Sequence, residues 1–454
     1  MADFLLDLGT PQQQEYETSH GFPVPRLAGD YAAAYRSSDI HRGMLELLDE
    51  TVDSSEYVET LPVFQRSMWT NTQDIVKRQC MLLLRDTNTL ESRAILVLVV
   101  ACVCSTNFIN VNVTNAPVTL GVLFMAPMFP LFEQSSQLSM FIAMREVFYK
   151  QRLANFFQTS AYVLGNILSQ VVLAVPESFI YGAFLYWITG LEASASAFVV
   201  YELILLSLLS SCLVLCSKSE WVDSVVKRDH WRSETRDNHS SYGSIRCRQD
   251  DTLGRKTTGT SCGEILLNGH QATELAIRRC TGYCEQMSIH SETATIREAL
   301  VFSAFLRQSR DIPDTSKMES VSENLEFLNL QDIADLMVRG QIFEQLKRLS
   351  IGVELAAQPS VLFLDEPTSG LDARFAKMLM EEIRRVADSG RTVICTIHLP
   401  SYEVFSLFDS LLLLKRGGET VFFGDCGALV GYFQAVPGVS PLPQDVNPAT
   451  WMLE

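Results

Sequence analysis

Two long stretches of the chain, residues 94–144 and residues 153–217, contain no lysine or arginine. Charge is scarce elsewhere too, since only 20% of the 454 residues are charged while 47% are hydrophobic. A polypeptide inside a lipid bilayer avoids charged side chains, whereas an ordinary soluble domain carries more of them. The composition therefore predicts a lipid-facing part joined to a soluble part, in a chain long enough for two or three domains.

Basic residues are also outnumbered by acidic ones over the whole chain. Lysine and arginine total 36, aspartate and glutamate total 53, and the net charge is −17. Binding to nucleic-acid phosphates needs clustered lysine and arginine. The charge balance therefore excludes nucleic acid as an expected partner.

The eleven cysteines include no C-x-x-C pair, so a disulfide scaffold is not expected. Cys280, Cys284 and His290 offer three metal-binding side chains, but no fourth ligand stands at a matching spacing, which disfavours a structural zinc site. The first ten residues have acidic side chains and no basic region, so we expect no cleavable signal peptide and a cytosolic N-terminus.

Four apolar segments lie in and around the stretches without basic residues. A helix needs about 20 mostly apolar residues to cross the hydrocarbon core. The segments therefore predict four membrane-spanning helices, at residues 94–111, 117–132, 160–190 and 195–216.

Basic clusters flank these segments and predict their orientation, because loops rich in lysine and arginine stay in the cytoplasm. They fall at residues 77–93, 145–152 and 218–228, which places both ends of the membrane part on the cytosolic side. The connection at residues 110–116 has no basic residue and contains an Asn-Val-Thr glycosylation pattern at Asn112, a weak sign of an outer loop.

Three glutamates and one aromatic loop in the membrane part leave alternatives open. Glu133, Glu177 and Glu202 would either line a substrate or proton path or be buried carboxylates bonded between helices, and we favour the second reading. Residues 144–157 mix basic and aromatic side chains, which fits an amphipathic interfacial helix or a positively charged inner loop.

The second half of the chain has a different character. Residues 218–262 are polar and read as a linker. After them, short β-branched or apolar segments such as SVLFLD alternate with amphipathic segments such as ARFAKMLMEEIRRVADSG. This alternation predicts an α/β domain with a mainly parallel sheet.

The segment SVLFLDEPTSGLDAR, residues 360–374, is the strongest chemical signal. It places Asp365 and Glu366 at the carboxyl end of an apolar strand, where open α/β sheets bind ligands. There Asp365 suits Mg²⁺ coordination and Glu366 suits activation of an attacking water. His398 follows the next strand, and Gln286 follows an earlier one with an amide that can accept from a metal-bound water and donate to phosphate.

These segments resemble the cassette of ATP-binding cassette proteins of the G type, most of all the second cassette of full-length pleiotropic-drug-resistance transporters of oomycetes, fungi and plants. Residues 345–374 are similar to the family's signature helix, Walker B strand and D-loop. The segments TGYCEQMSIHSETATIREAL, ICTIHLPS and NPATWMLE resemble its Q-loop, H-loop and cassette end, and REVFYKQRLANFF resembles its intracellular coupling loop. The opening ADFLLDLGT resembles the end of a preceding cassette, so we expect an internal piece of a longer protein, with four spans where the family implies six.

The resemblance implies roles for individual residues, with ATP and Mg²⁺ as cofactors. It implies Glu366 as general base, His398 as sensor of the γ-phosphate, and Asp365 with Gln286 as magnesium ligands. The remaining nucleotide-site residues, which also face the second cassette, are Ser369, Gly370, Asp372 and Gln345.

Two family motifs are missing or altered. A phosphate-binding loop reads G-x-x-x-x-G-K-[ST], but Lys256 would need glycine at positions that hold Asp250 and Arg255. The run LGRKTTGTSCGEILLNG instead matches a family segment that follows that loop. In QIFEQ, residues 341–345, Ile342 and Phe343 replace the serine and a glycine of the L-S-G-G-Q signature.

The predicted fold is therefore an α-helical transmembrane bundle plus an incomplete α/β cassette of the P-loop NTPase type. The predicted regions are a cytosolic connector (1–92), a transmembrane domain (93–217), a polar linker (218–262) and a cassette without Walker A (263–454). The resemblance implies a multi-pass exporter of hydrophobic compounds in the plasma membrane, with lipid and a second cassette as partners. The alternative is an inactive member or regulatory membrane scaffold that does not hydrolyse ATP.

Overall fold

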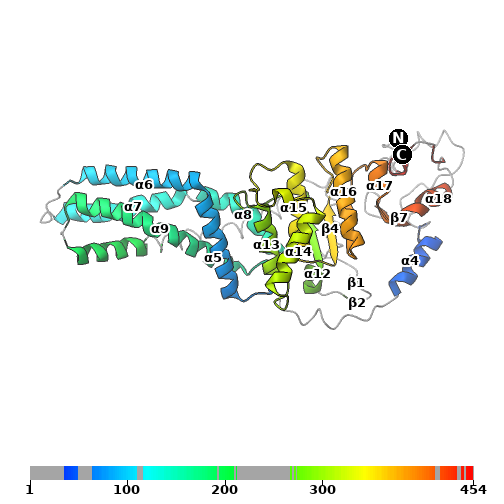
Figure 1. The fold of residues 1–454 in the computed structure, drawn as a ribbon, viewed down its shortest axis with the longest axis horizontal. Coiled ribbons are helices and arrows are strands. Elements are labelled where there is room, and N and C mark those ends of the chain that lie inside the picture. The colour runs from blue at the N-terminus through cyan, green and yellow to red at the C-terminus, as the bar shows by residue number, and fades with distance from the viewer. Residues whose placement is uncertain are drawn as a thin grey trace, which may run out of the picture.

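A computed structural model describes the protein, and Figure 1 shows two parts arranged along its long axis. Long helices form one end, and a sheet covered by helices follows beside them. The residues described are 35–49, 64–109, 116–136, 138–191, 194–208, 211, 266–267, 270–271, 274–414, 420–436, 441–443 and 446–452. The predicted linker, the opening segment, Asn112 and the GRKT segment lie outside them.

The helical end is built from α6 (Thr87–Asn107), α7 (Ala116–Ser136), α9 (Thr159–Thr189) and a helix at Ala195–Leu208. Only α6 and α9, among the described residues, are long and apolar enough to cross a membrane, and the regions of the other two predicted spans contain the shorter apolar helices Pro117–Met128 and Ala195–Leu208. Three of these helices begin within one residue of the predicted apolar segments, whereas α6 begins seven residues earlier, at Thr87.

Large apolar side chains point outward from this end, as expected for a surface in contact with lipid. Ile95 on α6 is 61% exposed and Phe179 on α9 is 57% exposed. Other residues pack between the helices, both small or polar-tipped ones such as Ala101, Cys104 and Tyr181 and larger apolar ones such as Leu185. Because lipid tails are as apolar as leucine, helices in a bilayer associate through such close packing.

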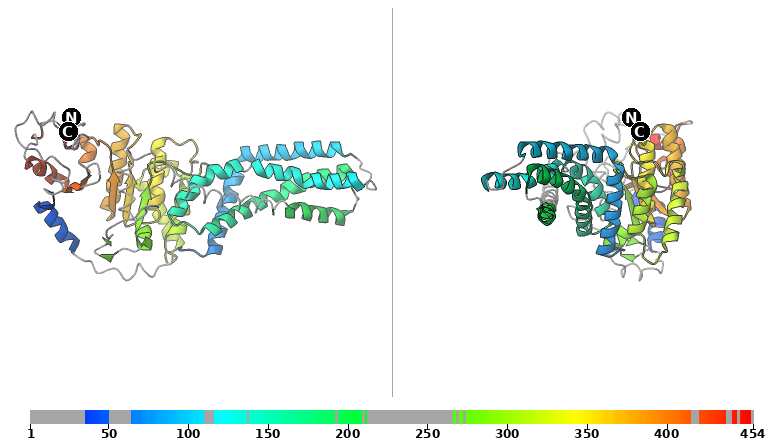
Figure 2. Two further views of the ribbon diagram at one scale, coloured as in Figure 1. Left: turned by 180° about the vertical axis from the view of Figure 1, so that it is seen from behind. Right: turned by 60° about the vertical axis from the view of Figure 1, so that its left-hand side comes forward.

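Two helices join the membrane part to the α/β part. Helix α5 (Met68–Arg85) lies at the junction between the two parts (Figure 2), and α8 (Leu138–Leu153) leads into it from the membrane side. Helices α5 and α9 approach closely at Gly165, where an added Cβ would stand 2.6 Å from Cγ2 of Ile75. The glycine therefore permits a spacing between the helices that a larger residue would prevent.

The α/β part contains a three-stranded parallel sheet with strand order β3-β4-β5. Its strands are β3 (Thr281–Cys284), β4 (Val361–Asp365) and β5 (Thr392–Thr396), and Asp365 pairs in register with Thr396. The surrounding helices are α12 (Glu274–Cys280), α13 (Ile296–Arg307), α14 (Asp314–Phe327), α15 (Phe343–Leu355) and α16 (Ala373–Asp388).

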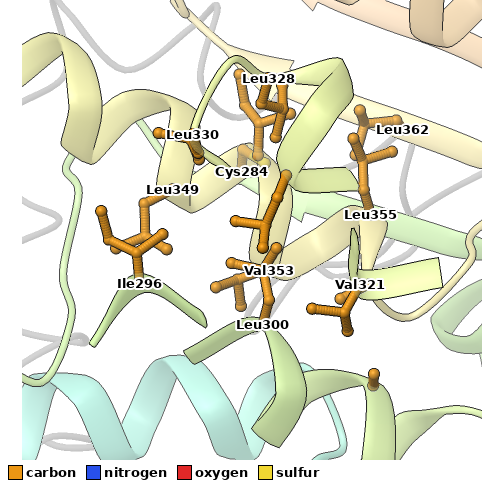
Figure 3. Packing of buried hydrophobic residues seen from close by; sticks show 14 of the residues in the cluster. Cys284, Ile296, Leu300, Val321, Leu328, Leu330, Leu349, Val353, Leu355 and Leu362 are labelled. Carbon is orange, nitrogen blue, oxygen red and sulfur yellow. The ribbon is translucent and has the colours of Figure 1, made fainter. Parts of the chain in front are cut away.

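One hydrophobic core holds these helices and the sheet together. Leu300 of α13, Leu349 of α15 and Leu362 of β4 are fully buried in it, as Figure 3 shows from close by. The same core includes Phe148 and Phe157, which come from α8 and the segment after it. The membrane part and the α/β part therefore share a continuous core at their junction.

The far end holds a smaller cluster around an antiparallel pair, β6 (Ser410–Leu414) and β7 (Thr420–Asp425). Helix α4 (Asp39–Asp49), from the N-terminal region, packs on β7 through Ile40. The remaining short elements are β1 (Leu266–Leu267), β2 (His270–Gln271), η2 (Gln331–Ile333), α17 (Tyr402–Phe405), η3 (Cys426–Ala428), α18 (Leu429–Gln434) and α19 (Pro448–Trp451).

The structure confirms the predicted fold class, a helical bundle joined to an α/β unit with a parallel sheet. The interfacial-helix reading of residues 144–157 is wrong, because Phe148, Phe156 and Phe157 are each at most 3% exposed and pack in the protein core. Basic and aromatic residues in one segment suit a membrane surface or a protein junction equally well, and only the packing separates the two.

Candidate functional site

The candidate site lies at the carboxyl ends of β4 and β5, where three polar side chains meet. Asp365 is the last residue of β4, Glu366 follows it, and Thr396 ends β5. The Thr396 hydroxyl donates to Asp365 Oδ1 at 3.0 Å and accepts from the Glu366 backbone N–H at 2.9 Å. The Thr396 hydroxyl thus joins both acidic residues to the neighbouring strand β5 by hydrogen bonds.

Glu366 has a left-handed backbone conformation, with φ at 45°. A non-glycine residue with positive φ is strained by about 1 kcal/mol or more, and such strain persists only where surrounding contacts hold it. The hydrogen bond from its N–H to Thr396 is one of those contacts. The turn directs the chain from β4 into the segment that carries Ser369 and Gly370.

Gln286 lies directly against the predicted general base. Its Nε2 donates to Glu366 Oε2 at 2.6 Å and stands 3.4 Å from Ser369 Oγ. Both Gln286 and Glu366 are half-buried. The structure therefore brings together Gln286, Asp365, Glu366 and Ser369, which come from two separate segments of the chain.

Lys347 of α15 contacts the backbone of both segments of the site, and the sequence did not predict this. Its side chain is buried, and Nζ donates to the backbone carbonyls of Gln286 at 2.7 Å and Glu366 at 3.5 Å. Burial lowers the pKa of the Lys347 ammonium, while the nearby carboxylates of Glu366 and Asp365 oppose that shift. Its cation holds the Q-loop-like segment and the acid turn together.

Tyr283 and Thr396 are two further polar residues that the sequence did not single out. Tyr283 stands on β3 with its hydroxyl 3.5 Å from Asp365 Oδ2. The alternation of side chains along β5 places Thr396 on the same side as His398, and this was the available signal. A lysine inside QLKRLS carries no such signal, because lysine in a helix usually faces water.

His398 lies two residues beyond Thr396 on an exposed stretch of chain. It has no hydrogen bond to any other residue that the structure describes, and it stands next to Leu399, whose φ is 44°. Because Asp365 and Thr396 are register partners, His398 follows β5 just as Pro367 follows β4. The histidine thus belongs to the same edge of the sheet, facing outward.

Three other predicted residues have contacts within this chain. Asp372 caps α16 by accepting from the Phe375 N–H at 2.8 Å, and the Gln345 Oε1 accepts from the Ile342 N–H at 3.2 Å at the start of α15. Gly370 has φ at 79°, and a Cβ there would stand 3.0 Å from the Phe343 ring. Phe343, in a signature position, therefore packs on the turn that follows the acids.

The donor set at this edge suits a hard cation only in part. The described residues contain no cluster of three or more His, Cys, Asp and Glu side chains able to hold a metal ion. Mg²⁺ prefers oxygen ligands and commonly completes its shell with water and phosphate oxygens. Asp365 therefore fits as one ligand of a nucleotide-bound magnesium, whereas the sequence supplies no loop to hold the phosphates.

Comparison with known proteins adds an independent line of evidence. A model of the ABC-2 type transporter family matches residues 70–217, and a second ABC-2 type transporter model matches residues 398–454. ABC transporter G family member 36 of Arabidopsis thaliana is 46% identical over 214 residues, which are 45% of this chain and 15% of the relative. Member 38 of Oryza sativa subsp. japonica is 48% identical over 214 residues, 45% of this chain and 14% of the relative.

The matches therefore cover a small share of these relatives' length. Among solved structures, cbiO1 from Clostridium perfringens, part of the ABC transporter complex cbiONQ, matches with a TM-score of 0.35 and 23% identity. That match covers 40% of this chain and 72% of the other. This likeness is too low to carry any argument about function.

Proposed function

We propose that this chain is an ABC transporter of the G family and that it serves ATP-driven export of hydrophobic compounds from a multi-pass position in the plasma membrane. The observation that carries the proposal is the hydrogen bond of 2.6 Å between Gln286 and Glu366. It lies beside Asp365, at the carboxyl end of β4. The apolar helices α6 and α9 supply the membrane part.

Each residue of the edge has a proposed task in this function. Bound ATP with Mg²⁺ would supply the phosphoryl group whose hydrolysis releases free energy. Asp365 would hold the cation, Gln286 would orient a water, and Glu366 would accept the proton of that water. His398 would donate to the terminal phosphate from the neighbouring strand.

The segment Ser369 to Asp372 and Gln345 would face a second cassette, in the same polypeptide or in another chain. Gly370 has a positive φ, which lets the turn run close to Phe343. The exposed apolar residues Phe343 and Ile342 near it, 44% and 55% exposed, would be covered in such a pair. We propose that the second cassette binds at this face.

The second candidate function is a membrane scaffold that does not hydrolyse ATP, and two features of the sequence support it. The sequence lacks the G-x-x-x-x-G-K-[ST] loop, and Ile342 and Phe343 replace signature residues. Backbone N–H groups of that loop and its lysine provide much of the phosphate binding in P-loop proteins. We therefore expect this chain alone to bind ATP negligibly.

One measurement tests nucleotide binding by this chain alone, and a second separates the two candidate functions. Equilibrium titration of the purified chain with a fluorescent ATP analogue and Mg²⁺ should give no saturation at micromolar concentrations, and micromolar binding would overturn that expectation. The chain should then be reconstituted in vesicles with and without a complete G-family half-transporter, and ATP-dependent efflux of a hydrophobic dye should be followed.

The transporter function predicts efflux by the mixture beyond that of the half-transporter alone, and the variant Glu366→Gln should abolish that increment. Glu403→Gln is a suitable control, since Glu403 is exposed on α17 and pairs with Lys377 rather than with any residue of the candidate site. An unchanged efflux on adding the chain would favour the scaffold.

A further inference from the structure

A small cavity of about 30 Å³ lies at the junction between α8 and the α/β core. Its polar lining includes Arg78 of α5, Lys150 and Gln151 of α8, His290, and Glu354 of α15. A cavity needs a volume of roughly 10–15 Å³ to hold one water molecule. The space thus suits one or two waters, or a single ion of similar size.

Lys150 brings an unsatisfied charge to this cavity. Its Nζ atom is buried and has no hydrogen-bond partner among the described residues. A lysine ammonium carries three donors, and leaving them unpaired away from water costs several kcal/mol. The Lys150 ammonium is therefore free to donate to a group bound in the cavity, since no described residue accepts from it.

The neighbouring charged groups do not supply the missing acceptor. Glu354 is the one carboxylate lining the cavity, and it already forms an ion pair with Arg307 at 2.9 Å. Arg78 adds a second cation, whose guanidinium lies 4.2 Å from the centre of the Phe302 ring. The cavity lining thus holds two cations, Lys150 and Arg78, and one carboxylate that Arg307 already neutralises, which leaves an excess of positive charge at the cavity.

His290 leaves this excess of positive charge unchanged. Burial lowers the pKa of His290 well below its usual value, and the nearby Lys150 cation acts in the same direction. The neutral ring makes a 2.8 Å hydrogen bond with the Ser350 hydroxyl. Near neutral pH the charge of the site is thus set by Lys150, Arg78, Arg307 and Glu354.

We propose that this cavity binds one small monovalent anion of the size of chloride, held by the Lys150 ammonium and the Arg78 guanidinium. The amide of Gln151 has an unpaired Oε1, and a half-turn of that amide presents its two donors to the anion instead. The bound anion would link α8 to the α/β core, and this site does not depend on nucleotide.

Thermal unfolding of the full-length chain in detergent tests the site, with chloride replaced by isethionate at constant ionic strength. We expect a saturable rise in Tm of about 2–4 °C once chloride exceeds its dissociation constant several-fold. Lys150→Met should remove the dependence on chloride. Lys77→Met should keep it, since Lys77 is an exposed lysine on α5.

Crystals grown in bromide give a second, structural measurement that does not require a variant to fold. An anomalous bromide peak inside the cavity is expected, and a cavity holding only water would overturn the proposal. A Tm of the wild-type chain that is independent of chloride would overturn it as well. A chloride dependence that survives in a folded Lys150→Met variant would contradict the assignment of the site.

Discussion

Arg85 of α5 and Glu298 of α13 form a two-pronged ion pair in which both N–O distances are 2.7 Å. The same carboxylate accepts from the Thr295 N–H at 2.9 Å and so completes the capping box that starts α13. One glutamate therefore defines the beginning of a helix in the α/β part and holds the end of the helix that leads to the membrane.

Replacing Glu298 with glutamine should weaken the junction without removing the helix cap, because glutamine also serves in a capping box. The two side chains are 26% and 32% exposed, so we expect a loss of about 1–2 kcal/mol in the free energy of unfolding. Arg85→Met should cost a similar amount, and the double variant should cost less than the sum. Denaturant titration measures all three.

Arg297→Met is the matched control, since its partner Asp335 is 78% exposed and such surface pairs contribute little. Equal losses for Arg85→Met and Arg297→Met would contradict the junction role.

The Arg85–Glu298 pair also predicts a pH dependence. The hydrogen bond from Arg85 is the main cause that lowers the pKa of Glu298 below its usual value of 4.5. The unfolded state therefore binds this proton first as the pH falls, so the contribution is complete above about pH 4.5 and is lost as the pH drops through the folded pKa. Stability curves below pH 4.5 should be flatter for Glu298→Gln than for the wild type.

His290 should add a second, higher window of pH dependence. Its folded pKa lies well below 6.5, chiefly because the ring is buried. Stability is then complete above about pH 6.5 and falls as the pH decreases, since only the unfolded histidine takes up the proton. At a fixed chloride concentration, His290→Gln should remove the slope between pH 6.5 and 5, and an unchanged slope would contradict this assignment.

The pair Arg93–Glu177 should be essential for the packing of α6 against α9. Two hydrogen bonds of 2.8 Å join the side chains, which are 7% and 17% exposed. Arg93→Leu leaves a buried carboxylate without a partner, so we expect a loss of about 3–5 kcal/mol. Thermal unfolding in detergent should show recovery of most of this loss in the double variant Arg93→Leu/Glu177→Leu.

The neighbouring Glu91 is exposed on α6, so Glu91→Gln should change stability by no more than about 0.5 kcal/mol. If the double variant is less stable than Arg93→Leu, Glu177 has a role other than pairing with Arg93.

Thr396→Val should destabilise the candidate site while preserving shape. The substitution leaves the Glu366 N–H without its acceptor and Asp365 Oδ1 without its donor, and an unsatisfied group of this kind costs about 1–3 kcal/mol. Thr392→Val lies on the same strand at an exposed position and should be nearly neutral. Chemical denaturation measures the free energy of unfolding of both variants. Equal losses would contradict a stabilising role for the Thr396 hydrogen bonds between β4 and β5.

Part of the candidate site could be predicted from the sequence, because its residues directly follow strands. Asp365 and Glu366 end an apolar run, Gln286 follows a short strand, and parallel strands bring their carboxyl ends to one edge. Their roles in catalysis remain predictions. Lys347 could not be found in this way, because its importance depends on carbonyl groups of two segments that only the folded chain brings within 3.5 Å.

The amino-acid order by itself determined the division into a membrane part and an α/β part, since hydropathy and the absence of charge act locally and need no partner. It also determined the strand ends that carry the acids. Only the tertiary structure decided that Arg93 pairs with Glu177, that Phe148 and Phe157 enter the protein core, and that the buried Lys150 Nζ has no hydrogen-bond partner among the described residues. These outcomes depend on distances between segments far apart in the chain, which local periodicity does not encode.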